Sequence, residues 1–96
     1  MISHIQANLL LDQYEAFLSP RQQEVLELYF QEDLSLKEIQ ENLDISKAAV
    51  YDALKKGVAM MEDFESKLHL VDKQNQLRQF LKEHPEYTEQ LGSLFD

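Results

Sequence analysis

Two capped helix starts, at Ser35 and Ser46, lie only eleven residues apart, and this spacing constrains the fold more than any other feature. Ser35 is followed three residues later by Glu38, which is the pattern of a capping box, and Ser46 is a second favourable N-cap. Each start is flanked by apolar residues at the positions of a hydrophobic staple: Leu34 with Ile39, and Ile45 with Val50.

The segment between these caps has room for one two-turn helix that ends near Leu43, followed by a tight turn. That geometry is typical of a helix-turn-helix, which we predict over residues 35–57. A plain helical hairpin within a bundle is the alternative interpretation.

Apolar residues at helical spacing predict two helices before this unit. The first runs from Ile2 to Phe17. Its expected core residues are Ile2, Ile5, Leu9, Tyr14 and Phe17, with Leu10 and Leu18 beside them. The second begins at Ser19 and Pro20, with Gln22 placed to close a capping box. Its expected buried residues are Val25, Leu26, Leu28, Tyr29 and Phe30.

The helix that starts at Ser46 is predicted to continue to Val71. Its apolar residues alternate in steps of four and three, as in a heptad repeat: Val50, Leu54, Gly57, Met61, Phe64, Leu68 and Val71. This seam is either packed against the chain's own helices or forms the interface of a homodimer. Gly57 lowers helix propensity but allows a neighbouring segment to approach closely.

The tail after Val71 is more polar. A stripe formed by Leu77, Phe80 and Leu81 predicts another helix, which we expect to end at His84 because Pro85 follows. A last short helix is suggested by Tyr87, Leu91, Leu94 and Phe95. The fold class predicted is therefore all-α, with a helix-turn-helix domain over residues 1–71 and a helical tail, residues 72–96, packed on it.

Composition narrows the functional classes. The chain has 96 residues, no cysteine, and a net charge of −9 from 18 acidic and 9 basic residues. No secretory signal or membrane-spanning run is apparent, so we expect a cytoplasmic protein. The histidines lack metal-ligand spacing and no glycine-rich phosphate loop is present, so neither enzyme activity nor a cofactor is expected.

Five blocks of residues, in order and in register, resemble the YlxM family of Gram-positive bacteria, small helix-turn-helix proteins similar to region 4 of sigma factors. The blocks are Leu18-Ser19-Pro20-Arg21-Gln22, Glu27-Leu28-Tyr29-Phe30, Leu34-Ser35-Leu36 with Glu38-Ile39, Ser46 with Ala49-Val50-Tyr51-Asp52, and Glu65 with Lys67-Leu68-His69-Leu70. The resemblance covers residues 9–70. It implies a regulatory role in the signal recognition particle pathway, with the particle's GTPase or its receptor as partner.

Three positions depart from the family pattern. Lys47 and Ala48 stand where the family has Arg and Gln, so the bidentate contacts that these residues make with guanine and adenine are lost. Gln40 replaces a small residue where the two helices of the unit approach each other. The sequence leaves open whether Gln40 splays the helices or lies along the surface.

The candidate nucleic-acid-binding residues lie at the start of the expected recognition helix. They are Ser46, Lys47, Ala48, Tyr51, Asp52, Lys55 and Lys56. Tyr51 either stacks on a base or bonds a phosphate, or it covers the edge of the core. Because DNA affinity rests on lysines and arginines that neutralise phosphates, this acidic chain is expected to bind DNA or the particle's RNA weakly at best.

Two functional classes remain. One is a non-enzymatic accessory protein of the secretion pathway that binds a protein partner through its acidic surface. The other is a transcriptional regulator that binds DNA as a dimer. We expect a homodimer from the seam and the small size of the chain.

Overall fold

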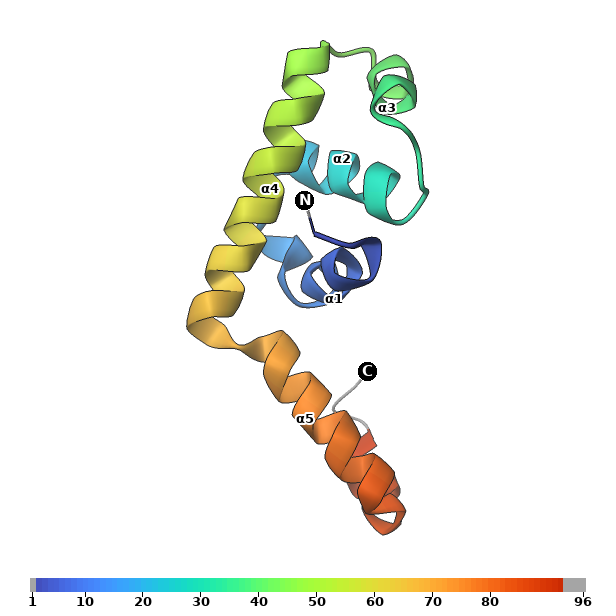
Figure 1. The fold of residues 1–96 in the computed structure, drawn as a ribbon, viewed down its shortest axis with the longest axis vertical. Coiled ribbons are helices and arrows are strands. Elements are labelled where there is room, and N and C mark those ends of the chain that lie inside the picture. The colour runs from blue at the N-terminus through green and yellow to red at the C-terminus, as the bar shows by residue number, and fades with distance from the viewer. Residues whose placement is uncertain (1, 93–96) are drawn as a thin grey trace.

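In the computed structural model, which describes residues 2–92, every regular element of those residues is a helix (Figure 1). In chain order they are α1 (His4–Tyr14), the 3₁₀ helix η1 (Glu15–Phe17), α2 (Pro20–Phe30), α3 (Leu36–Leu43), α4 (Lys47–Leu68), α5 (Leu70–Glu83), the 3₁₀ helix η2 (Pro85–Tyr87) and α6 (Thr88–Leu91). The all-α prediction is confirmed.

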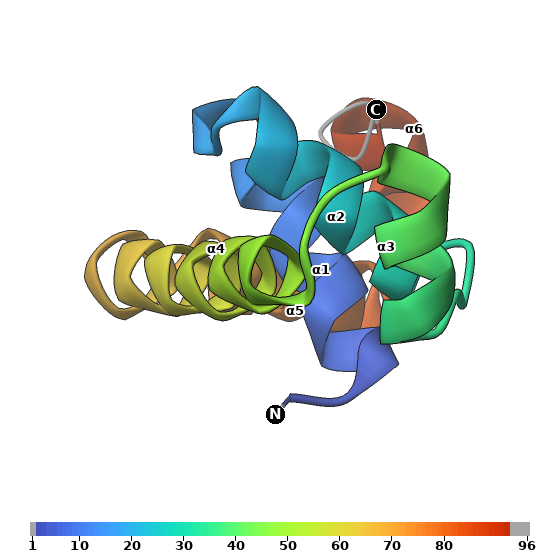
Figure 2. The same cartoon turned by 90° about the horizontal axis from the view of Figure 1, so that it is seen from above.

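The long helix α4 is the element against which α1, α2 and α3 all pack. Figures 1 and 2 show these three helices on one side of α4, with α1 and α2 crossing it. The largest of the almost fully buried side chains come from all four helices: Tyr14, Leu11, Leu26, Ile39, Leu54, Met61, Val25 and Val50. The core is therefore the interior of this four-helix body.

The predicted caps are present and define the helix-turn-helix. The Glu38 backbone N–H donates to Ser35 Oγ at 3.1 Å, and the Ser35 N–H donates to Glu38 Oε1 at 3.0 Å. This bond from the backbone lowers the pKa of Glu38. Ser46 Oγ accepts from the Ala49 N–H at 3.1 Å, and Asp44 adopts the left-handed conformation that ends α3. The short α3, tight turn and α4 confirm the predicted unit.

The prediction for the first helix was wrong at its start and in part of its buried face. The α-helix begins at His4, after a Ser3 cap, and runs to Tyr14, and the 3₁₀ helix η1 continues the helical segment to the predicted end at Phe17. Ile5 and Phe17, expected in the core, are 79% and 62% exposed. Tyr14, Leu10 and Leu18 are buried as predicted, and Ala7 and Leu11, which were not predicted, are buried with them. Because apolar residues surround most of this helix, spacing alone did not decide which face would meet α4.

Most of the heptad-like seam lies inside the chain. Val50, Leu54, Gly57 and Met61 are buried in the core. Gly57 marks the crossing with α2, where an added Cβ would lie 2.9 Å from Leu26 Cδ1. The packing of these four positions is thus intramolecular.

The prediction that this helix continues to Val71 was wrong. The helix ends at Leu68, because His69 is left-handed, with φ 55° and ψ 33°. Of the remaining seam positions, Phe64 is half-buried, Leu68 is 46% exposed, and Val71 belongs to α5. Tertiary hydrogen bonds at this bend, described below, stop the helix there.

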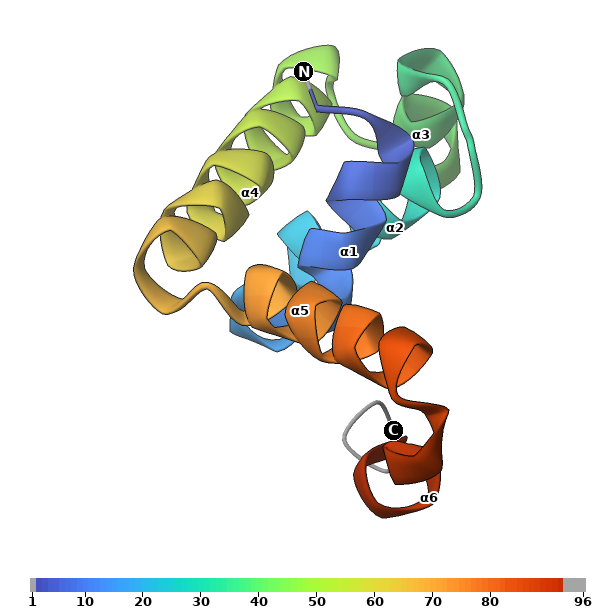
Figure 3. The same ribbon diagram turned by 60° about the horizontal axis from the view of Figure 1, so that its bottom comes forward.

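The tail leaves the body after this bend (Figure 3). The start of α5 contacts α1, and its far end packs on η2, which in turn contacts α6. The helix ends at Glu83, before His84 and Pro85, as predicted. The expected last short helix is α6; Leu94 and Phe95, also assigned to it, lie outside the described residues.

A pair of carboxyl groups lies at the connection between α1 and α2. Hydrogen bonding to Glu27, partial burial, and the negative charges of Glu27 and Asp12 raise the pKa of Glu15 to about 7. The neutral form of Glu15 is therefore favoured in the folded chain. This contribution to stability is fully present below the usual carboxyl pKa of 4.5 and is lost as pH rises through about 7.

Glu15→Gln is accordingly expected to gain stability relative to the wild type as pH rises from 5 to 8, by of order 1 kcal/mol after allowance for solvent screening. Urea unfolding of both proteins across this range measures the difference. Glu24→Gln, on the exposed side of α2, is the control. A difference that does not change with pH would contradict the assignment.

Gly57→Val is expected to destabilise the chain by about 1–3 kcal/mol, because a Cβ alone would lie 2.9 Å from Cδ1 of the fully buried Leu26, and the two further methyl groups of valine must also fit there. Urea unfolding followed by circular dichroism at 222 nm measures the loss. The matched control is Gly92→Val, where, among residues 2–92, an added Cβ has only Thr88 Cγ2 within 4 Å, at 3.9 Å. Equal effects at both glycines would show that the α2–α4 crossing does not require glycine.

Candidate nucleic-acid interface

The residues predicted to bind nucleic acid lie together on the first half of α4 and its cap. All seven are exposed: Ser46, Lys47, Ala48, Tyr51, Asp52, Lys55 and Lys56. The Ser46 cap and the buried Val50 and Leu54 fix the rotation of α4, since they turn its opposite side into the core. The structure therefore presents the predicted residues as one solvent-facing surface.

Three of these residues form a stripe along α4, which we call the basic–aromatic stripe: Lys47, Tyr51 and Lys55. They are spaced four residues apart and so occupy one face of the helix. Lys47 Nζ lies 5.9 Å from the centre of the Tyr51 ring, within cation–π range. Tyr51 is 47% exposed, so much of its ring is open to a ligand.

On the face of α4 next to the stripe, a lysine is paired with an aspartate. Lys56 Nζ lies 3.0 Å from Asp52 Oδ1, and both side chains are more than half exposed. An exposed pair of this kind contributes little to stability, but it places a carboxylate beside the stripe and engages one of the three lysines. The surface as a whole carries three lysines and one aspartate, a net charge of +2.

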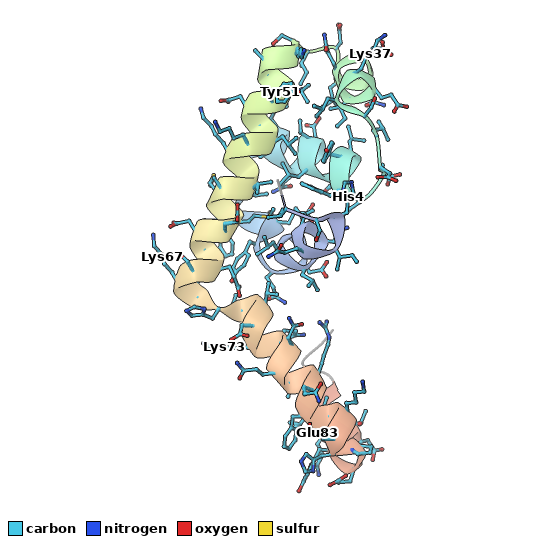
Figure 4. All side chains as sticks on the ribbon, viewed as in Figure 1. His4, Lys37, Tyr51, Lys67, Lys73 and Glu83 are labelled. Atoms are coloured by element: carbon cyan, nitrogen blue, oxygen red, sulfur yellow. The ribbon has the colours of Figure 1, made fainter. Side chains whose placement is uncertain are left out.

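A shallow depression of about 320 Å³ lies beside the stripe, between the start of α3 and the start of α4. Its lining residues are Leu36, Lys37, Gln40, Glu41 and Lys47. Gln40 is half-buried and lines this depression, whereas its neighbour Ile39 is fully buried in the core. Figure 4 shows Lys37 and Tyr51 at the same end of the molecule.

Lys37 was not among the predicted site residues. Its place in the first turn of α3, beside the start of α4, brings it next to Lys47 around the depression. Glu41 offsets one of these two positive charges. The helix-turn-helix signal locates Lys37 on α3, but only the packing of the two helices shows that it joins the surface of α4.

Other chemistry has little support in the described part of the chain. Over residues 2–92, no group of three histidine, aspartate or glutamate side chains is placed to hold a metal ion. His4 packs against the rings of Tyr29 and Phe30 and lies 3.3 Å from Asp33. None of the helices in this range is long and apolar enough to cross a membrane.

Comparisons with known proteins agree with this architecture. Residues 1–93 match the family described as "Putative helix-turn-helix protein, YlxM / p13 like". A UPF0122 protein of Exiguobacterium sp. is 40% identical over 89 residues, covering 90% of this chain and 83% of its own. A similar protein from Pediococcus pentosaceus is 40% identical over 90 residues, covering 85% of this chain and 80% of its own. One from Bacillus mycoides is 38% identical over 96 residues, covering 93% of this chain and 87% of its own.

The Asp52–Lys56 pair allows a sharp test of this surface. Asp52→Asn releases Lys56 and removes the carboxylate beside the stripe, so its affinity for a short DNA or RNA duplex is expected to rise several-fold at about 50 mM salt. Fluorescence anisotropy measures the change. Asp63→Asn breaks the equivalent pair with Lys67 at 2.9 Å, at the other end of α4, and alters the net charge equally. Equal gains in both variants would mean that net charge, not this surface, governs binding.

Proposed function

Because this chain belongs to the UPF0122 family of YlxM/p13-like helix-turn-helix proteins, we propose that it is a non-enzymatic accessory protein of the signal recognition particle pathway. In this role it binds the particle's GTPase or the receptor of the particle. The helix-turn-helix serves as a rigid scaffold for that contact rather than as a reader of DNA sequence.

The observation that supports this proposal most strongly is the make-up of the recognition surface. Sequence-specific helix-turn-helix proteins read base edges with side chains near the start of this helix. Here Ala48 offers no hydrogen-bonding group, and Asp52 is engaged by Lys56 at 3.0 Å. Lys47, Tyr51 and Lys55 remain, a set suited to phosphates or to a protein surface but poor at discriminating bases.

Charge also favours a protein partner. The chain has a net charge of −9, so its long-range field repels nucleic acid and attracts a basic protein surface. Complementary charge speeds association and selects the partner more than it adds affinity. An accessory protein that joins and leaves a larger assembly needs this kind of contact.

The basic–aromatic stripe favours a second candidate, a regulator that binds DNA as a dimer, or that binds the particle's RNA. Exposed lysines can neutralise phosphates, and an exposed tyrosine can stack on an unpaired base. A dimer would place two stripes on successive half-sites of a duplex. Few phosphate contacts per chain are available in either case, so this binding would be weak and sensitive to salt.

Reversal of Lys47, Lys55 and Lys56 to Glu separates the two candidates. If the accessory role is correct, purified GTPase or receptor binds the chain at about 150 mM salt, and a capture experiment from native cytoplasm retains that protein after nuclease treatment. We expect the triple reversal to abolish any nucleic-acid shift seen at about 50 mM salt, where electrostatic contacts are strongest. The control reverses three exposed lysines outside the helix-turn-helix: Lys67, Lys73 and Lys82.

The outcomes are distinct. Loss of nucleic-acid binding with retained binding of the GTPase or receptor assigns the two contacts to different surfaces. Loss of both in the same variant assigns them to one surface. Failure of the purified GTPase and receptor to bind the wild-type chain, together with a robust nucleic-acid shift, overturns the accessory role and favours the regulator.

A further inference from the structure

The bend between α4 and α5 is made by a single residue. His69 separates a helix of 22 residues from one of 14, and it takes the left-handed conformation that is unfavourable for residues other than glycine. No glycine or proline stands between Gly57 and Pro85. The local sequence is therefore compatible with one unbroken helix, and the bend has to be held by contacts from elsewhere in the chain.

Those contacts come from two side chains, Tyr14 and Glu65, which together we call the clasp. Tyr14, fully buried on α1, donates its hydroxyl to Glu65 Oε1 at 2.5 Å and accepts from the Leu70 N–H at 3.1 Å. Glu65 accepts from the N–H groups of Val71 and Asp72 at 3.0 and 3.2 Å. The clasp thus satisfies three consecutive amides at the start of α5.

An unbroken helix would satisfy the same three amides in another way. Their partners would be the carbonyls of residues 66–68, four residues back. The flanking bonds, from the His69 N–H to Glu65 O and from the Lys73 N–H to His69 O, already have helical spacing and can persist in both arrangements. The backbone amides of residues 70–72 are therefore hydrogen-bonded in both the bent and the straight form.

The other contributions to the free-energy difference between the bent and the straight form oppose one another. The bent form keeps the Tyr14–Glu65 bond and the contacts of α5 with α1, including the partly buried Val71. The straight form relieves the left-handed His69 and extends the apolar series of Met61, Phe64, Leu68 and Val71 along one helix. In the bent form Leu68 and Leu70 are 46% and 36% exposed at the corner, so the bend leaves apolar surface in water.

We propose that the α4–α5 corner is a two-state latch. When the clasp holds the amides of residues 70–72, the chain is bent; when the clasp opens, α4 and α5 join into one helix over residues 47–83. Such a helix is about 54 Å long. The latch links the orientation of the tail to a side-chain contact on α1, and it does so independently of the partner proposed above.

Distances between spin labels test this proposal directly, because the chain has no cysteine of its own. Labels are attached at Ala59→Cys and Lys82→Cys, both exposed positions on α4 and α5. In one straight helix these backbone positions lie about 35 Å apart, and a bend brings them closer. The wild type is expected to show mainly the shorter distance, and Glu65→Ala to raise the long-distance population about tenfold or more.

Two substitutions of His69, to glycine and to alanine, provide a second test that leaves Tyr14 and Glu65 unchanged. Glycine tolerates the left-handed conformation and weakens a helix, whereas alanine does the reverse. His69→Gly is therefore expected to lower the long-distance population, and His69→Ala to raise it, with about a tenfold difference between them.

Circular dichroism confirms that each variant remains folded. Identical distance distributions for the His69 pair would overturn the latch, even if Glu65→Ala fails to fold. A folded Glu65→Ala variant would also overturn it if its distances stayed short, or if they became broad without a peak near about 35 Å.

Discussion

The clasp between Tyr14 and Glu65 is the interaction on which the shape of the molecule depends. Burial raises the pKa of Tyr14, and its bond to Glu65 adds to that effect. Burial also raises the pKa of Glu65, but the bonds donated by Tyr14, Val71 and Asp72 outweigh it, so the pKa lies below its usual value. The ionised carboxylate caps α5 from a neighbouring helix, and α1, α4 and α5 meet at this one point. The direction in which α5 leaves the body therefore depends on the contact between Tyr14 and Glu65, which are 51 positions apart in the chain.

The helix-turn-helix is constructed separately from the clasp and shows how one scaffold can serve different functions. Its caps and buried residues, Ile39, Val50 and Leu54, belong to the fold and would suit a DNA-binding protein equally well. Its outer surface carries the residues on which the proposed function rests. There the basic–aromatic stripe supplies two lysines and a tyrosine, and the Asp52–Lys56 pair cancels the charge next to them. These features, with the net charge of −9, support the proposed contact with a basic protein surface.

Local signals in the sequence were reliable wherever the interaction that they describe is itself local. The Ser19 and Ser35 capping boxes and the Ser46 cap were predicted and are present, because each involves residues three apart. The seven residues predicted to bind nucleic acid are exposed together on one surface, because the rotation of α4 follows from its buried positions. The resemblance to the family was placed over residues 9–70, whereas the family match extends over residues 1–93. Lys37 was missed because its nearness to Lys47 depends on how α3 meets α4.

By itself, the sequence determined the capped helix starts at Ser19, Ser35 and Ser46, the order of the helices up to α4, and the exposed side of the first half of α4, since these depend on spacing within a few residues. Only the tertiary structure decided which face of α1 is buried, because apolar residues surround that helix and packing against α4 chooses among them. It also decided that the seam turns inward at Gly57, where Leu26 fills the space. Above all, it decided that the helix stops at Leu68. Nothing near His69 breaks a helix, and the amides that would continue it are taken by Tyr14 and Glu65.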